Sequence, residues 1–176
     1  VINGELRARE LARVAELAET SQPSFLWSGP FLQMHNSALK ANFAQTRSYV
    51  YDGEVVDRQT HLGLDLASTA RAPVPAPNAG VVVFAGWLTL YGNAVIIDHG
   101  YGLFSLAGHL ASIDVAEGHP VTKGQVIGRS GATGLAGGDH LHLEIFIQGQ
   151  SVEPLEWFDA KWLRDNLATK LTVPVE

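Results

Sequence analysis

The stretch His140-Leu141-His142-Leu143-Glu144-Ile145-Phe146-Ile147 alternates between polar and apolar residues over most of its length. Alternation of this kind is typical of a β-strand, because successive side chains of a strand point to opposite faces. His140, His142 and Glu144 would share one face, and the leucines and isoleucines would share the other. The pattern predicts a strand that carries two imidazoles and a carboxylate opposite an apolar row.

A second polar pair occurs upstream, in His61-Leu62-Gly63-Leu64-Asp65-Leu66. The three leucines occupy alternate positions, so on a strand all three would face the core, while His61 and Asp65 would lie together on the opposite face. Two segments far apart in the sequence are thus each predicted to present a histidine beside another group that can bind a metal.

The composition indicates a mainly β domain. The 18 glycines and 8 prolines often separate short apolar runs, which favours short strands joined by turns. Further strands are predicted at Ala79–Phe84, Ala94–Asp98 and Val126–Gly128. The 176 residues fit one domain with extensions.

Short helices are predicted at both ends of the chain. Between Gly4 and Thr20, apolar residues recur at helical spacing with charged residues between them. Asn3 is a candidate N-cap for this helix, which we interpret as a surface helix or a connector to an upstream region. A second helix is expected from Trp157 onward.

Charge and composition exclude several classes of function. The net charge is −6, so the basic surface that nucleic-acid binding requires is absent. The chain has no cysteine, which excludes disulfides, thiolate metal sites and a cysteine nucleophile. No apolar run approaches the ~18 residues of a transmembrane segment, and no signal peptide is visible. Because the sequence begins with Val1 and not with Met, we expect that an upstream region is missing from it.

The two polar strand faces suit a metal ion. A single histidine on a sheet face is more often an ordinary half-exposed residue than a ligand. Here two segments each supply a histidine, one of them with a carboxylate, and three such ligands plus a water form the usual catalytic zinc site. The alternative is that two polar faces occur by coincidence, which we consider the weaker interpretation.

Three motifs in the sequence together resemble the signatures of the lysostaphin/LytM-type zinc metallopeptidases, peptidase family M23. They are His61-Leu-Gly-Leu-Asp65, Gly108-His109-Leu110 and His140-Leu141-His142. The segments between them agree with the family in order and spacing: Val121 to Gly128, Ser130 to Gly134, and Glu153-Pro154. The resemblance extends from about Phe43 to Phe158.

The resemblance implies a role for each motif residue. His61, Asp65 and His142 match the family's metal ligands, which would hold one Zn²⁺ per chain. His109 and His140 match two histidines that lie beside the metal without binding it, and so are candidate catalytic residues. The implied fold is an antiparallel β-sheet core with a narrow groove. The implied reaction is hydrolysis of peptide cross-links or bridges in peptidoglycan, with a metal-activated water as the nucleophile and the peptide stems as the partner.

The resemblance also suggests how the chain is divided and where it acts. Residues 31–158 would form the peptidase domain, preceded by a helical segment and loop at 1–30 and followed by a helical extension at 159–176. The substrate class implies a location in the cell envelope, periplasmic or extracellular. The sequence leaves open which peptide bond is cut.

Two positions depart from the family's common pattern. Many relatives have an aromatic residue in place of Ala107, so we expect a wider groove or weaker substrate packing there. Many also have proline in place of Asp139, whose carboxylate would either support a histidine or, as we favour, lie solvated in a turn.

Several other residues receive structural interpretations. His35, His99 and His119 are expected to be structural or on the surface. Tyr49 and Tyr51 precede the first motif and could donate to a transition state, but packing is the favoured role for each.

Two other functions compete with hydrolysis. A non-catalytic relative that binds peptidoglycan or activates another hydrolase would keep the fold, but such domains usually lack one or more ligands, and all five motif positions are filled here. A biotinyl or lipoyl carrier is suggested weakly by Lys123 next to Gly124. That interpretation leaves the histidines without a role.

Overall fold

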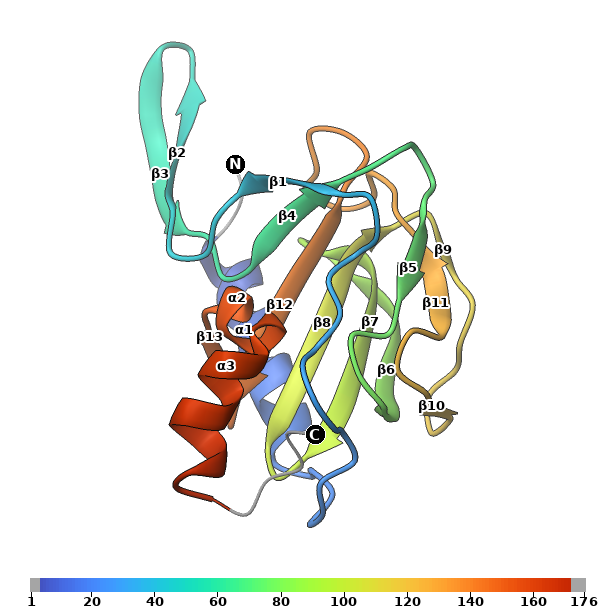
Figure 1. Ribbon diagram of the computed structural model, residues 1–176. Coiled ribbons are helices and arrows are strands. Elements are labelled where there is room, and N and C mark those ends of the chain that lie inside the picture. Colours follow the sequence, from blue (N-terminus) through green and yellow to red (C-terminus); the bar gives the residue numbers. More distant parts are fainter. Residues whose placement is uncertain (1–3, 172–176) are drawn as a thin grey trace.

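A computed structural model describes residues 4–171 and is built around one antiparallel sheet of eight strands (Figure 1). Seven of its strands follow the order β1-β4-β12-β8-β7-β6-β10, and β13 pairs with β12. Their bounds are β1 Ala38–Ala41, β4 Leu64–Ala67, β6 Gly80–Leu88, β7 Gly92–Gly100, β8 Leu103–Leu110, β10 Pro120–Val121, β12 Leu141–Ile147 and β13 Gln150–Val152.

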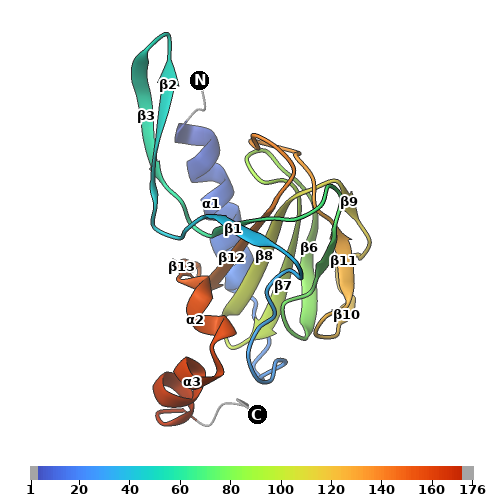
Figure 2. The ribbon, with the colours of Figure 1, turned by 45° about the horizontal axis from the view of Figure 1, so that its top comes forward.

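Two smaller sheets accompany the large one. The first has the order β5-β11-β9 and packs against the large sheet. The second is the hairpin β2-β3, which projects from the body of the molecule (Figures 1 and 2). The bounds are β5 Pro73–Pro75, β9 Ser112–Ile113, β11 Val126–Arg129, β2 Thr46–Tyr51 and β3 Glu54–Thr60. The predicted mainly β, antiparallel fold is confirmed.

The main core lies between the large sheet and the three-stranded sheet. Leu141 and Leu143 of β12 point into it, as the alternation predicted, and meet Val74 of β5 and Ile127 of β11. Every residue of β8 is buried, because both faces of this central strand are covered. Within residues 4–171, no helix has both the length and the apolar character that a membrane crossing requires.

Helix α1 (Gly4–Ala18) covers the other face of the large sheet (Figure 2). Val14 packs there against a cluster that includes Ile96, Leu106 and Phe146. Phe146 has the same parity as His142 and Glu144 along β12, so α1 covers the face that carries those polar side chains. The predicted surface helix is therefore docked on the sheet; Asn3, its predicted cap, lies outside the described residues.

A third cluster joins the loop after α1 to the C-terminal helices. Trp27 and Phe31 meet Trp157 with ring centroids 5.9 and 5.4 Å apart. The helix predicted from Trp157 onward is in fact three short ones, with Asp159 capping the second through its carboxylate. They are α2 Pro154–Phe158, α3 Ala160–Leu163 and the π-helical turn η1 Arg164–Ala168.

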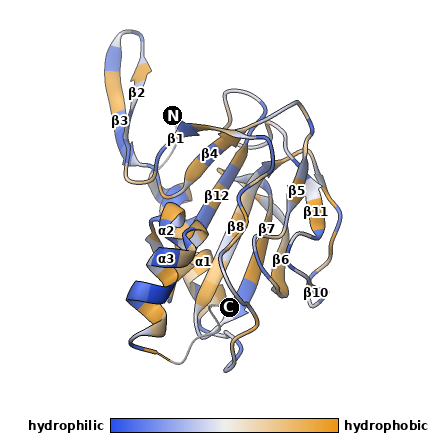
Figure 3. Cartoon of the chain, viewed as in Figure 1, coloured by the Kyte–Doolittle hydropathy of each residue, from blue (hydrophilic) through white to orange (hydrophobic). Residues whose placement is uncertain are grey.

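The structure corrects one sequence prediction about strands and adds a central strand that was not predicted. The segment His61–Gly63 precedes β4 and is not part of the strand. Leu62 therefore does not join Leu64 and Leu66 in the core but lines a cavity. Strand β8 was not predicted, because a strand buried on both faces shows no alternation. Figure 3 shows hydrophobic and hydrophilic segments along the central strands.

Candidate metal centre

Strand register brings Asp65 and His142 together. They are directly opposite each other in the antiparallel pair β4–β12, so their side chains leave the same face side by side. On the other side of β12, His142 is paired with Gly108 of β8. The sheet thus fixes the spacing of two of the three predicted ligands.

His61 reaches the same point from the loop before β4. Its Nδ1 lies 2.7 Å from the carbonyl oxygen of Asn42, and its Nε2 lies 3.0 Å from Asp65 Oδ1 and 3.1 Å from His142 Nδ1. Asp65 Oδ1 and His142 Nδ1 are also 3.1 Å apart. The three atoms form a nearly equilateral triangle, and all three residues are buried.

This triangle fits a zinc ion. Two atoms bound to zinc at tetrahedral angles and 2.0–2.1 Å lie about 3.3 Å apart, close to the observed sides. A carbonyl oxygen can only accept a hydrogen bond, so Asn42 holds the proton of His61 on Nδ1 and leaves the Nε2 lone pair for a ligand. The chemistry and spacing of His61, Asp65 and His142 are those of a three-ligand zinc site.

Close packing at Gly63 supports the position of His142. A Cβ atom at Gly63 would lie 2.4 Å from the carbonyl oxygen of Leu143 and 2.9 Å from His142 Nε2. Only glycine allows the loop that carries His61 to approach β12 this closely. Gly63 of the first motif is thus needed because any larger residue would collide with the strand that carries the third motif.

The second nitrogen of His142 points toward a buried carboxylate. His142 Nε2 is buried, makes no hydrogen bond to residues 4–171, and lies 3.6 Å from Glu144 Oε2. Glu144 accepts hydrogen bonds from the hydroxyls of Tyr91 at 3.0 Å and Ser151 at 2.5 Å. Burial, and then the charge of Glu144, raises the pKa of Tyr91 well above its ordinary value. Metal-binding histidines are commonly oriented by a carboxylate in this way.

Asp65 is held in its ionised form. Burial alone would raise the pKa of its carboxyl group, but its side-chain interactions with His140, His142 and His61 outweigh burial and hold the pKa far below its usual range. Its second oxygen, Oδ2, forms an ion pair with Arg47 of the hairpin. Oδ1 therefore remains the oxygen that faces the histidines.

A β-bulge directs His109 into the site. Strands β7 and β8 align Val95 with Ala107 and Asn93 with Leu110, so one residue of β7 faces both Gly108 and His109. His109 has a φ of 60°, a left-handed conformation that costs about 1–2 kcal/mol. The bulge lets its side chain leave the sheet near His142, with ring centroids 5.8 Å apart, instead of entering the core beside Ala107. Bulges commonly redirect side chains in this way.

His109 and His140 lie beside the triangle as a pair, with ring centroids 4.7 Å apart. Their Nδ1 atoms lie 2.9 Å from the carbonyl oxygen of Thr133 and 2.8 Å from that of Gly138. Each neutral ring therefore carries its lone pair on Nε2. Burial, and then the neighbouring His142, lowers the pKa of His109 to about 4. His109 is thus neutral at neutral pH and able to accept a proton.

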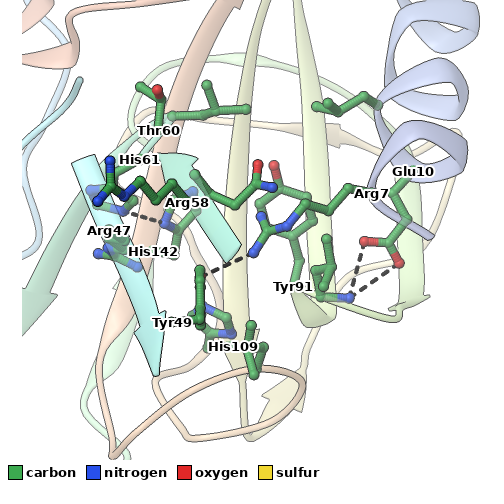
Figure 4. A pocket seen from close by; sticks show the side chains of 15 residues that line it. Arg7, Glu10, Arg47, Tyr49, Arg58, Thr60, His61, Tyr91, His109 and His142 are labelled. Atoms are coloured by element: carbon green, nitrogen blue, oxygen red, sulfur yellow. Dashed lines mark hydrogen bonds between the residues drawn. The ribbon is translucent and has the colours of Figure 1, made fainter. Parts of the chain in front are cut away.

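The site opens into a cavity of about 320 Å³. Its floor includes His61, His109 and His142. Its walls come from helix α1, which supplies Arg7, and from the hairpin, which supplies Tyr49 (Figure 4). Three of the five predicted site residues line this cavity, and Asp65 and His140 lie beside them with Oδ1 and Nε2 3.5 Å apart. The walls were not predicted.

The two family departures have structural explanations. Ala107 is 3% exposed and packs in the main core, so the prediction that this position lines the groove is wrong; Tyr91 stands over the site instead, 5.4 Å from His142 between ring centroids. Asp139 accepts hydrogen bonds from the hydroxyl of Ser130 and the backbone N–H of Arg71. It neither supports a histidine nor lies freely solvated, but links two loops.

The remaining candidates have ordinary roles. His99 is fully buried and hydrogen-bonded to Ser105 Oγ and the carbonyl oxygen of Ala79, while His35 and His119 are exposed. Tyr51 is 70% exposed near the hairpin tip. Tyr49 lines the cavity, where its hydroxyl accepts a hydrogen bond from Arg7.

Relatives with known sequences carry the same core. DD-carboxypeptidase/endopeptidase Mpg of Neisseria meningitidis is 45% identical over 95 residues, which are 54% of this chain and 22% of that protein. Murein hydrolase activator EnvC of Escherichia coli is 38% identical over 95 residues, which are 54% of this chain and 23% of that protein. The chain thus matches less than a quarter of each relative's length.

Solved structures share the fold. A peptidase M23 structure from Pseudomonas aeruginosa aligns with a TM-score of 0.68 and 31% identity, covering 84% of this chain and 58% of that one. The catalytic domain of lysostaphin from Staphylococcus simulans aligns with a TM-score of 0.61 and 26% identity, covering 71% and 94%. Residues 59–154 match the model of Peptidase family M23. That match spans more than half of the described chain and contains all three motifs, and the chain belongs to peptidase family M23.

Proposed function

We propose that this chain is a zinc-dependent endopeptidase that hydrolyses peptide cross-links or bridges in bacterial peptidoglycan. The observation that carries the proposal is the triangle of His61 Nε2, Asp65 Oδ1 and His142 Nδ1, with sides of 3.0 to 3.1 Å. Three ligands leave the fourth position of a tetrahedral site open, as catalysis requires. A zinc ion bound there would polarise the scissile carbonyl and lower the pKa of its water to about 7.

The residues of the chain would divide the remaining work. Asp65 stays ionised and completes the ligand set, and Glu144 orients His142. His109 and His140 each present Nε2 to the site, where either can take a proton from the attacking water and return one to the leaving amine. The cavity walls hold the peptide on the same side of the sheet as these two rings.

We also propose that residues 31–158 form the peptidase domain, with the N-terminal segment 1–30 and the C-terminal segment 159–176 as extensions. Its substrate class places the protein in the cell envelope, where peptidoglycan peptide stems would be its partner. The relatives that match this chain include one named as a DD-carboxypeptidase/endopeptidase and one named as a peptidoglycan DD-endopeptidase.

Digestion of defined muropeptides, followed by product masses, tests this function directly. Zinc-loaded protein is expected to release peptide fragments, a chelator should stop the reaction, and zinc should restore it. The fragment masses would also identify the bond that is cut. Intact muropeptides in the presence of zinc would overturn the hydrolase proposal.

A second function is favoured by the match to EnvC, which is named as a murein hydrolase activator. A domain of that kind would stimulate a separate hydrolase without binding zinc itself. The filled ligand triangle argues for catalysis, and the zinc content of the purified protein distinguishes the two. An activator would stimulate a partner hydrolase equally well after His142→Ala.

A further inference from the structure

Three arginines gather at the cavity of an otherwise acidic protein. The chain has a net charge of −6, yet Arg7, Arg47 and Arg58 all line the cavity that contains His61 and His142. They come from helix α1 and the two strands of the hairpin, outside the residues 59–154 that match the family. This cationic wall thus lies outside the segment that matches the family model.

Arg7 is fixed in place by Tyr49. Its Nη2 donates to the Tyr49 hydroxyl at 3.0 Å, and its guanidinium lies 5.6 Å from the centre of the Tyr49 ring (Figure 4). Its Nε is buried and has no hydrogen-bond partner within residues 4–171. A buried donor without a partner is costly, so Arg7 has hydrogen-bonding capacity that the described residues do not use.

Three nearby carboxylates already have hydrogen-bond or ion-pair partners, and one of them, Glu10, lines the same cavity. Both oxygens of Glu10, one turn after Arg7, accept from the backbone N–H of Leu90 at 3.2 and 3.0 Å. Asp65 forms an ion pair with Arg47. Asp57 accepts from the backbone N–H of Arg58 and from the Gln59 amide.

Arg58 is the member of the wall best placed to meet a ligand. It is exposed on β3, and among the described residues its guanidinium makes no ion pair or hydrogen bond. Arg47 is already paired with Asp65, and the charge of Glu10 lies on the same cavity one turn from Arg7, so Arg58 carries the least compensated positive charge of the three. A guanidinium binds a carboxylate through two parallel hydrogen bonds.

We propose that Arg7 and Arg58, with Arg47 beside them, form a subsite that recognises a free carboxylate of the peptide substrate close to the bond that is cut. This inference rests on the proposed peptidase function and adds its substrate class: acidic peptides, in preference to the same peptides with that carboxylate amidated. The wall lies on the same cavity as the ligand triangle, so a bound carboxylate would set the register of the peptide relative to the metal.

The test compares two synthetic muropeptides that differ only by a free carboxylate or a carboxamide near the cleaved bond. For the zinc-loaded protein, kcat/KM should be roughly three- to tenfold higher for the acid, as expected of a partly exposed charge pair. Arg58→Gln should abolish this preference by lowering kcat/KM for the acid toward the value for the amide, and Arg7→Gln should reduce the preference. Arg9→Gln, which changes the same charge on α1 but faces a different surface cavity, should behave as the unaltered protein.

Binding measurements distinguish failure of the subsite proposal from failure of the peptidase proposal. Dissociation constants for both peptides are measured by calorimetry on His140→Ala, with and without Arg58→Gln. If neither peptide is cleaved but the acid still binds more tightly and loses this advantage in Arg58→Gln, the subsite stands and the hydrolase proposal fails. Equal binding and cleavage of the two peptides, or an acid preference that survives both Arg58→Gln and Arg7→Gln, would overturn the subsite.

Discussion

Asp65 and His142 lie directly opposite each other on β4 and β12, with Asp65 Oδ1 and His142 Nδ1 3.1 Å apart. They are 77 residues apart in the chain, and the register of one antiparallel strand pair makes them neighbours. A shift of that register by one residue would turn one of the two side chains into the core. The register of this strand pair therefore fixes the spacing of two of the three candidate ligands.

Gly63 is predicted to control the position of His142. In Gly63→Ala, the new Cβ would approach the Leu143 carbonyl oxygen at 2.4 Å and His142 Nε2 at 2.9 Å, so the loop or the imidazole must move. We expect weaker zinc binding together with a lower melting temperature. Gly137→Ala is the matched control, since a Cβ there meets nothing within 4 Å. Equal zinc affinity in the two variants would show that the close approach does not matter.

Glu144 is predicted to support the metal through His142. Glu144→Gln keeps the size of the side chain and an acceptor oxygen for one of the two hydroxyls of Tyr91 and Ser151, but removes the charge near His142 Nε2, 3.6 Å away. Loss of such a partner typically weakens metal affinity by about 10–100-fold. Zinc competition with a chromogenic chelator measures this. If circular dichroism shows that the variant is folded and its zinc affinity is unchanged, Glu144 does not support the metal.

His99 is predicted to make the fold sensitive to acid. Burial, only partly opposed by the hydrogen bond to Ala79 and the charge of Asp98, lowers its pKa from 6.5 to about 4. The unfolded chain therefore takes up a proton below pH 6.5 that the folded chain accepts only near pH 4. The contribution of His99 to the free energy of unfolding is therefore fully present above pH 6.5. It falls by about 3 kcal/mol when the pH is lowered to 4.

Urea unfolding of the metal-free protein at pH 7 and pH 4.5 checks this expectation. His99→Asn should be less stable at pH 7 because it loses a buried hydrogen bond, but its stability should fall less between the two pH values. If the unaltered protein and His99→Asn lose the same free energy on acidification, His99 does not titrate as described.

Ala107→Tyr is predicted to destabilise the core. Ala107 is 3% exposed and packs in the main core with Val95 and Leu143, so a tyrosine there cannot line the cavity. Overpacking of this kind costs about 1–3 kcal/mol, which chemical denaturation would detect. A stable variant with altered substrate preference would mean that position 107 faces the groove after all.

The sequence was sufficient to predict features that depend on the residue pattern within a single strand. Alternation in His140–Ile147 correctly placed His142 and Glu144 on one face of β12, because the period of a strand is local. The bulge at His109 is different: it exists only relative to β7, so no pattern within β8 reveals it. Arg7 was equally hidden, since helical periodicity indicates which face of α1 packs but not which part of the sheet it covers. Glu144 was placed on the correct face but given no role. Its position two residues after His142 could have suggested that it supports this histidine.

The central claim concerns which residues hold the metal, and zinc stoichiometry measured alongside kcat for two variants tests it most directly. The unaltered protein should bind one zinc per chain. His142→Ala should lose zinc and activity together, because it removes one corner of the triangle. His140→Ala should keep zinc and lose turnover by roughly 10²–10⁴-fold, as expected of a proton-transfer group. Retention of zinc by His142→Ala with its loss from His140→Ala would reverse the ligand assignment, and loss of zinc from both would indicate four protein ligands and contradict the catalytic account.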